Sequence, residues 1–187
     1  MNQIGTKTIE TERLILRKYT LDDIQSMFDN WASDPEVSKY VGWDVHDTID
    51  VTTEIITSWI NKYENPLSFN WAVVLKDTNE LVGSIEVIKV KEKDGFGEIG
   101  YCYSKKTWGQ GIGTEALRAV LNYVFNEADF RIIEIRYLEN NPASGKVMEK
   151  AGLKYETKLR DRTVDKNGLI NDILIYSITK DEWSDLK

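Results

Sequence analysis

The sequence predicts an α/β protein of the α+β kind, with a mixed central sheet of about seven strands and about four helices. Two observations support this fold class. Apolar residues follow a helical period early in the chain, alternate at every second position over residues 69–104, and return to the helical period from residue 111. No linker, repeat or low-complexity tract interrupts the 187 residues, so we expect residues 1–187 to form a single domain.

The first third of the chain predicts a short strand and two helices. Residues 13–17 (RLILR) are apolar enough for the strand. Thr20 and Asp23 resemble a capping box at the start of the first helix. The apolar face of that helix is expected to hold Ile24, Met27, Phe28 and Trp31. A second helix is expected over residues 48–63, with Val51, Ile55, Trp59 and Tyr63 on one side.

The middle of the chain predicts an antiparallel meander followed by a parallel crossover. Strands over residues 69–75, 81–90 and 96–104 are joined by short polar loops, which suit antiparallel pairing. A helical period over residues 111–128 and a strand over residues 131–137 follow. The order strand, helix, strand predicts one parallel crossover.

The last third predicts a short helix and a hairpin. Within residues 140–152, Asn141 suits the N-cap, Pro142 the first turn and Gly152 the end of the helix. The remaining expected elements are strands over 153–163 and 169–178, a hairpin turn at 165–168 and a short helical turn at 180–185.

Composition excludes several classes of protein. Hydrophobic residues make up 41% of the chain and charged residues 29%, as in globular proteins. The formal net charge of −7 disfavours nucleic acid as a partner and slightly favours a cationic one. No stretch approaches the roughly 20 apolar residues of a membrane span, and residues 1–14 lack the apolar run of a signal peptide. We therefore expect a cytoplasmic protein that does not bind a membrane.

The single cysteine and the single histidine support neither a metal site nor a Cys/His nucleophile. Cys102 is expected to be a small strand residue, and His46 a loop residue far from it in the sequence. Too few such residues are present for a usual zinc site, so no metal is predicted.

The stretch KKTWGQGIGTEAL at residues 105–117 packs three glycines just before a helix. Its second and third glycines formally match a dinucleotide fingerprint. That motif follows a buried parallel strand directly, whereas polar residues and an antiparallel meander precede this one. No Gly-Lys-Ser/Thr sequence closes the turn, which excludes the NTPase phosphate loop. Two readings stay open: an anion-binding turn at a helix N-terminus, or a sharp connection with no ligand.

Three segments together resemble the GCN5-related N-acetyltransferases, in the branch that contains the bacterial ribosomal-protein N-terminal acetyltransferases. They are IETERLILRKYTLDD near the start, WGQGIGTEAL at residues 108–117 and NNPASGKVMEKAG at residues 140–152. The resemblance covers nearly the whole chain. One departure is that Trp108 stands where the family usually has the Gln or Arg that opens the glycine motif.

The resemblance implies that acetyl-CoA is the co-substrate. Its pyrophosphate would lie on the backbone amides of the glycine turn, and its pantetheine arm between the strands at 96–104 and 131–137. A bulge is expected near Gly100, where a backbone amide would polarise the thioester carbonyl. The residues implied to bind the cofactor are Tyr101, Cys102, Tyr103, Trp108, Gly109, Gln110, Gly111, Ile112, Gly113, Thr114, Asn141 and Ser144.

The resemblance also names catalytic candidates. Met148 occupies the position where many relatives carry a proton-donating tyrosine, so Ser144 becomes the candidate donor to the cofactor sulfur. Glu98 is the first candidate for the general base, and Glu86 and Asp172 are weaker ones. Ser144 and Asn141 are also ordinary residues for the start of a helix, and Glu98 is equally compatible with a solvent-facing strand position.

The acceptor is expected to be a primary amine, either a protein N-terminus or a small molecule. Trp31, Tyr40 and Trp43 are candidates for its binding site, with Trp43 foremost, although aromatic residues there also suit packing. The reaction would be direct transfer in a ternary complex. A catalytically silent acyl-CoA-binding sensor is the alternative, and the sequence is compatible with both a monomer and a homodimer.

Overall fold

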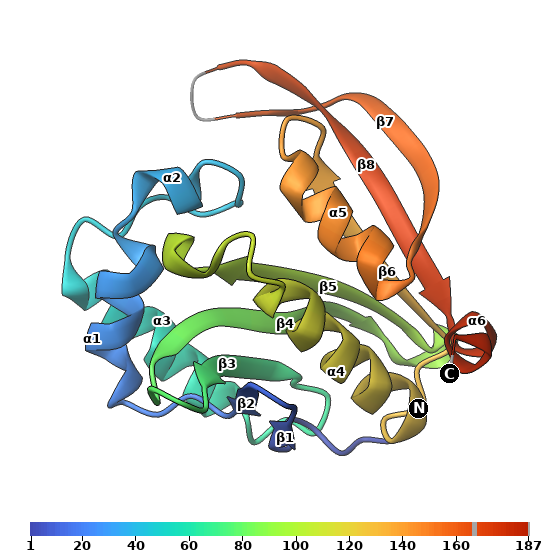
Figure 1. The fold of residues 1–187 in the computed structure, drawn as a ribbon, viewed down its shortest axis with the longest axis horizontal. Helices are drawn as coiled ribbons and strands as arrows, with labels where there is room; N and C mark the ends of the chain where they lie inside the picture. The colour runs from blue at the N-terminus through green and yellow to red at the C-terminus, as the bar shows by residue number, and fades with distance from the viewer. Residues whose placement is uncertain (166–167, 187) are drawn as a thin grey trace.

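A computed structural model describes residues 1–165 and 168–186 of the chain (Figure 1). These residues form one eight-stranded sheet in the order β1-β2-β3-β4-β5-β6-β8-β7. The strands are β1 (Ile9–Glu10), β2 (Leu14–Arg17), β3 (Asn70–Leu75), β4 (Leu81–Lys91), β5 (Phe96–Tyr103), β6 (Ile132–Leu138), β7 (Lys154–Val164) and β8 (Ile170–Thr179). The helices are α1 (Asp23–Met27), which continues into a π-helical turn (Phe28–Ala32), α2 (Pro35–Ser38), α3 (Ile49–Lys62), α4 (Ile112–Asn126), α5 (Pro142–Ala151) and α6 (Lys180–Asp185).

The mixed sheet confirms the predicted fold class. Strands β1 to β5 pair antiparallel in sequence order, β5 and β6 pair parallel across α4, and β8 pairs antiparallel with both β6 and β7. The hairpin β7–β8 projects from the body of the molecule (Figure 1). Residues 166 and 167 of the predicted turn lie outside the described residues.

Helices cover the sheet on two sides. On one side α4 and α5 pack on the strands, and Leu117, Leu121 and Met148 are fully buried in that core. On the other side α1, α2 and α3 enclose a smaller core around Trp31 and Ile56. Because residues alternate along β5, its odd-numbered side chains face α4 and α5, and its even-numbered side chains face the opposite side.

Four details differ from the sequence-based expectation. The structure adds β1 and α2, whose two and four residues are too short to show a period. Helix α3 buries Thr52 and Ile56, while the predicted face residues Val51 and Ile55 are exposed. At α1, Asp23 accepts a hydrogen bond from the Thr20 amide and also from Arg17, which makes only half of a capping box.

The fourth difference concerns the bulge. The register between β4 and β5 shifts between Val87 and Lys89, so the extra residue is Ile88 of β4. Gly100 pairs in regular register with Glu86. The prediction of a bulge in β5 was therefore wrong, because the bulge lies in the neighbouring strand β4. A Cβ at Gly100 would lie 3.2 Å from Ile88 Cγ2, so the glycine makes room for the bulged side chain.

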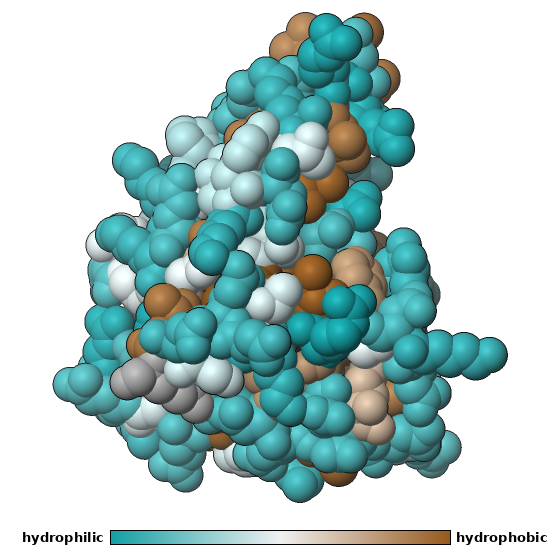
Figure 2. All heavy atoms as spheres, turned by 90° about the vertical axis from the view of Figure 1, so that its right-hand side faces the viewer, coloured by the Kyte–Doolittle hydropathy of each residue, from teal (hydrophilic) through white to brown (hydrophobic). Residues whose placement is uncertain are grey.

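Within the described residues, no helix combines the length and the apolar character needed to cross a membrane. The side of the molecule seen in Figure 2 is mainly polar, with apolar side chains on its upper part, where the hairpin projects. The exposed apolar residues of the hairpin end are Val164, Leu169 and Ile170.

Candidate active site

The central feature of the site is a seam between β5 and β6. The parallel pairing of these strands runs only from Phe96 with Ile132 to Ile99 with Ile135. Beyond that point β5 continues to pair with β4, and β6 continues to pair with β8. Two strand edges with unpaired backbone groups therefore face each other past Ile99, and such groups can bind an extended ligand through its amides.

The glycine turn lies next to this seam. Gly109 and Gly111 have φ angles of +77° and +81°, in the left-handed region that favours glycine. Gly111 is the N-cap of α4, and the amides of the first turn of this helix point toward solvent without intrahelical partners. A Cβ at Gly109 would meet no atom within 4 Å. The turn is thus an open cradle of backbone donors at the positive end of a helix dipole.

Gly113 has a different role, because it makes room for Tyr103. The Tyr103 ring lies between Gly83 of β4 and Gly113 of α4, and a Cβ at either glycine would press on it. Among the described residues, the Tyr103 hydroxyl and the neighbouring Ser104 hydroxyl are buried without a hydrogen-bond partner. Buried polar groups are rarely left unpaired, so these hydroxyls fit a site completed by a polar ligand.

A set of contacts centred on Glu115, here called the clasp, joins the start of the chain to the glycine turn. No sequence pattern indicated it. Glu115, in the first turn of α4, accepts hydrogen bonds from the Thr11 hydroxyl at 2.6 Å and from the Arg13 amide at 3.0 Å. It also forms a bidentate ion pair with the Arg13 guanidinium. Arg13 Nη1 in turn donates to the Gln110 carbonyl at 3.0 Å. The clasp joins the TERL segment to the glycine segment, although the two are far apart in the sequence.

The same clasp sets the charge state of Glu115. Partial burial acts to raise the pKa of Glu115, but hydrogen bonds from Thr11 and from the Arg13 backbone and side chain outweigh it and lower the pKa below its usual value. Arg13 therefore stays paired, and its guanidinium lies beside the glycine turn.

The other predicted residues of the turn contribute unequally. The Trp108 indole donates from Nε1 to the Tyr103 carbonyl at 2.9 Å and leaves much of its ring exposed. Ile112 is buried in the core, so only its backbone can serve a ligand. Thr114 is half-buried in the first turn of α4. Gln110 donates from its side chain to the Lys106 carbonyl, which fixes the shape of the turn.

Across the seam, the start of α5 presents Asn141 and Ser144. The Asn141 side chain caps α5 by accepting a hydrogen bond from the Ser144 amide at 3.4 Å. The Ser144 hydroxyl lies 3.0 Å from the Tyr101 hydroxyl, which also donates to the Ser144 carbonyl at 3.1 Å. Burial raises the pKa of Tyr101 above its usual value, so this phenol stays protonated. The structure thus brings Tyr101 and Ser144 together at the seam.

On the other side of the sheet, a half-buried carboxylate lies level with the start of the seam. Glu86 of β4 is paired with Gly100, the residue of β5 directly past the last β5–β6 pair. Burial raises the pKa of Glu86, and the Lys62 ammonium of α3 opposes that rise only in part. Tyr63 of α3 and Cys102 of β5 also face this carboxylate.

Cys102 is confirmed as a strand residue with an inert thiol. Burial and the nearby Glu86 carboxylate raise the pKa of the Cys102 thiol to about 12. The thiol is therefore neutral near pH 7, and a neutral thiol is a poor nucleophile. His46 is buried and bonds through Nδ1 to the Thr52 hydroxyl at 2.8 Å. No group of metal-ligating side chains occurs among the described residues.

The remaining base candidates have other partners. Glu98 lies 3.5 Å from Arg136, which also forms a 2.7 Å pair with Glu134. Asp172 belongs to the hairpin, where hydrogen bonds from Lys158 and from the Asp161 amide lower its pKa. Each of the two carboxylates therefore already has a cationic partner, Arg136 for Glu98 and Lys158 for Asp172.

The aromatic candidates for an acceptor site also separate. Trp31 is fully buried, so it is a core residue and offers no surface to a substrate. Tyr40 is half-buried, and the Lys39 ammonium lies over its ring. Trp43 is half-buried beside His46, at a ring distance of 5.4 Å. Of these three aromatic candidates, Tyr40 and Trp43 have side-chain surface that a substrate can contact.

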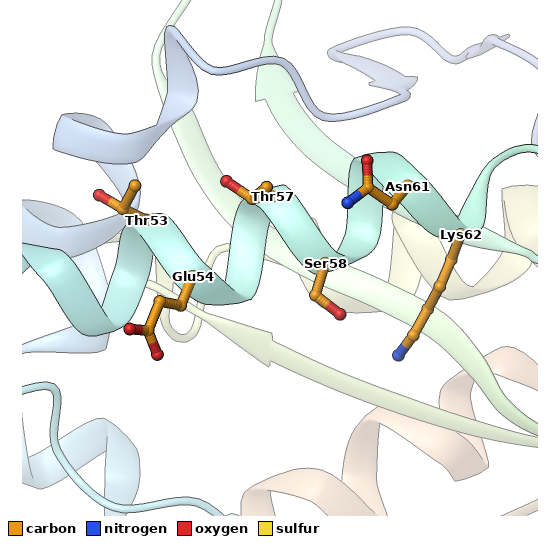
Figure 3. Close-up of a pocket in the computed structure, with 6 residues that line it drawn as sticks. All are labelled: Thr53, Glu54, Thr57, Ser58, Asn61 and Lys62. Atoms are coloured by element: carbon orange, nitrogen blue, oxygen red, sulfur yellow. The ribbon is translucent and has the colours of Figure 1, made fainter.

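A shallow polar depression follows α3 on the same side of the sheet as Glu86. In Figure 3, Thr53, Thr57 and Asn61 form one row along the helix, and the other three residues form the row next to it. The residues that line the depression are Thr53, Glu54, Thr57, Ser58, Asn61 and Lys62. Lys62 connects this depression to Glu86, whose pKa it influences.

Comparison with known proteins gives the same interpretation as the geometry. A family model described as "Acetyltransferase (GNAT) domain" matches residues 13–154. The chain is 30% identical over 172 residues to "Uncharacterized N-acetyltransferase YoaA" of Bacillus subtilis (strain 168), an alignment covering 92% of this chain and 96% of that protein. It is 33% identical over 129 residues to "Putative ribosomal N-acetyltransferase YdaF" of the same strain, covering 69% of each.

A solved structure agrees over almost the entire chain. The acetyltransferase (GNAT family) from Bacillus anthracis is 28% identical, with a TM-score of 0.82, and the match covers 94% of this chain and 99% of that one. The open strand seam, the cradle of amides and the unpaired buried hydroxyls fit the extended, anionic acetyl donor that this family uses. The chain belongs to the GNAT acetyltransferase family, and it is an N-acetyltransferase whose acetyl donor is acetyl-CoA.

Proposed function

We propose that the enzyme transfers the acetyl group directly to a primary amine, in a ternary complex at the β5–β6 seam. One observation carries this proposal. The hydroxyl pair of Tyr101 and Ser144 lies on one side of the sheet, and the half-buried carboxylate of Glu86 lies on the other, both close to Gly100 along the strands. A group that stabilises a leaving sulfur and a group that deprotonates an amine are what direct aminolysis of a thioester requires.

On the donor side, the residues of the glycine turn bind and orient. Backbone amides between Gly109 and Thr114 hold the pyrophosphate, and Arg13, paired with Glu115, holds the Gln110 carbonyl of the turn in place. Trp108 borders the turn, and Asn141 fixes the start of α5. The open edges of β5 and β6 hydrogen-bond the pantetheine amides.

At the reacting carbonyl, backbone donors do the electrostatic work. An amide of β5 near Tyr101 or Cys102 polarises the thioester carbonyl, because β5 presents an open edge past Ile99. The Ser144 hydroxyl then donates a hydrogen bond to the departing sulfur. Met148 is buried and has no proton to give, so Ser144 is the donor nearest to the seam on α5.

On the acceptor side, Glu86 suits the general base better than Glu98. A base works best when its pKa lies near the working pH, and burial shifts the pKa of Glu86 in that direction. Glu98, in contrast, is paired with Arg136. Glu86 also pairs with Gly100, the first residue of β5 past the β5–β6 pairing, so it lies one strand away from the seam.

The acceptor class follows from charge and shape. The net charge of −7 favours a cationic amine over an anionic one. The shallow depression along α3 is an open surface rather than a closed pocket, which suits a peptide better than an enclosed small molecule. One relative carries a name that includes ribosomal N-acetyltransferase, which supports protein N-termini as the first acceptors to test. Small-molecule amines are the second class.

An acceptor screen with detection of released thiol tests the proposal. The enzyme and acetyl-CoA are incubated with N-terminal peptides and with a panel of small primary amines. We expect thiol release that depends on one class of amine and yields the N-acetyl product by mass spectrometry. Double-reciprocal plots should intersect, as for a ternary complex. Parallel lines, or an acetylated enzyme without acceptor, would contradict direct transfer.

A further inference from the structure

The contact between Tyr101 and Ser144 joins two elements that are far apart in sequence. Tyr101 is the second residue of β5 past the end of its pairing with β6, and Ser144 is in the first turn of α5. The two hydroxyl oxygens are 3.0 Å apart, and the Tyr101 oxygen is also 3.1 Å from the Ser144 carbonyl. The sequence patterns assigned Tyr101 only to backbone contact with the acetyl donor.

Two arrangements of the hydroxyl protons are possible in this geometry. In the first, Tyr101 donates to the Ser144 carbonyl, and Ser144 donates back to the Tyr101 oxygen. In the second, Tyr101 donates to Ser144 Oγ, which leaves the serine proton free for a third acceptor. A sulfur that gains negative charge at the seam selects the second arrangement. The chain of two hydroxyls then polarises the serine O–H bond and strengthens its hydrogen bond to sulfur.

Tyr101 is well suited to stay a neutral donor. Burial is the main cause that raises the pKa of Tyr101, and the nearby Tyr137 adds to it. A thiol has an ordinary pKa of about 8.5, well below that of a buried phenol, so the tyrosine proton does not pass to sulfur. Its ring also packs on Tyr103, at a centroid distance of 5.7 Å, which limits its movement.

We propose that Tyr101 is a positioning residue that directs the Ser144 hydroxyl at the departing sulfur. This inference rests on the proposed function of the seam. When the carbon–sulfur bond breaks, its electron pair goes to sulfur, and the hydrogen bond from Ser144 stabilises the thiolate. The proton that sulfur finally takes is the one that the acceptor nitrogen has lost. Both hydroxyls therefore keep their own protons, and the step is balanced.

A double-mutant cycle tests the inference, with Tyr101→Phe, Ser144→Ala and the double variant. Phenylalanine fills the same space, so the fold is expected to persist. We expect Tyr101→Phe to lower kcat about tenfold with the KM for acetyl-CoA changed less than about twofold, the size expected for one hydrogen bond made mainly in the transition state. In the Ser144→Ala background, Tyr101→Phe should have no further effect on kcat, because the residue acts through Ser144.

Tyr176→Phe is the matched control. Tyr176 of β8 is a buried tyrosine that, like Tyr101, bonds to α5, through its hydroxyl to Glu149 Oε1 at 2.9 Å, but at the far end of the helix. If Tyr101 only anchors α5, the two variants should behave alike, and that result overturns the inference. Equal losses of kcat from Tyr101→Phe with and without Ser144 would also overturn it. If the wild type turns over and Tyr101→Phe has the same kcat, this inference alone is wrong. If the wild type releases no thiol with any amine, the proposed function is wrong.

Discussion

Two glycines with the same backbone conformation allow ligand binding to be separated from backbone strain. Gly109 and Gly168 have φ angles of +77° and +78°, and a Cβ at either would meet no atom within 4 Å. Alanine at each should cost about 1 kcal/mol of stability, because the left-handed region is unfavourable for L-residues. Only Gly109→Ala should also weaken acetyl-CoA binding, by about tenfold, because its methyl group obstructs the amide cradle. Calorimetric titration of both variants measures this, and equal affinities would contradict the assignment of the turn.

The half-buried carboxylate of Glu86 predicts a conflict between stability and activity. Burial raises its folded-state pKa, so the stability contributed by the neutral form is fully present below the ordinary glutamate pKa of about 4.3 and is lost as pH rises through the folded pKa. Glu86→Gln should therefore raise Tm at pH 7, with the difference disappearing near pH 4. If Glu86 is the base, the same variant should lower kcat about a hundredfold and remove the acid limb of the pH profile.

Glu98→Gln is the control for that experiment, since Glu98 is half-buried on the neighbouring strand and paired with Arg136. It should lower Tm slightly at pH 7 and leave the acid limb in place. If the acid limb of the pH profile disappears in Glu98→Gln and persists in Glu86→Gln, then Glu98 is the general base.

At the scale of elements, local patterns predicted what local interactions determine. The caps of α5 at Asn141 and Gly152, the meander and the parallel crossover all depend on residues close in sequence, and the structure confirms them. The glycine turn was predicted as either an anion-binding turn or a sharp connection without a ligand, and its anion-binding role stays a prediction. The bulge at Ile88 was misplaced because its position depends on packing over Gly100, one strand away.

The parts that the sequence did not reveal are contacts across long separations. Thr11 and Arg13 meet Glu115 more than one hundred residues away, and Tyr101 meets Ser144 across 43 residues. Glu86 was only a weak candidate, because nothing in its strand signals burial. Such pairs can be recognised only once the strand order brings the elements together.

The clasp between the opening strand segment and α4 yields a prediction for both stability and binding. The pKa of Glu115 is lowered, so its stabilising effect is present above about pH 4.3 and is lost as pH falls through its folded pKa. Glu115→Gln should cost about 1 kcal/mol in urea unfolding at pH 7 and much less near pH 3. Acetyl-CoA affinity should fall several-fold, because Arg13 no longer holds the Gln110 carbonyl in place.

Glu127→Gln is the control for the clasp, because Glu127 forms a looser and more exposed pair with Lys7 at 3.7 Å. It should leave acetyl-CoA affinity unchanged. A double cycle of Arg13→Gln with Glu115→Gln should show clear coupling. Additive effects would mean that the two side chains do not act together on the turn.

For the whole molecule, the net charge of −7 sets opposite expectations for the two substrates. A protonated amine acceptor is attracted by the field of the protein, and this attraction is screened as salt rises. Acetyl-CoA is anionic, so the same field repels it, although Lys105 beside the turn offsets that repulsion locally.

Between about 20 and 200 mM salt, we therefore expect kcat/KM for the amine to fall several-fold, because the Debye length shrinks from roughly 20 Å to below 10 Å. The kcat/KM for acetyl-CoA should stay constant or rise over the same range of salt. Steady-state kinetics with each substrate varied at saturation of the other measures both quantities. A parallel fall for the two substrates would mean that salt acts on the enzyme itself and not on the approach of the acceptor. If kcat/KM for a cationic acceptor does not change with salt, local contacts determine its binding, such as those with Glu86 and the depression along α3. The field of the whole chain would then have little effect on it.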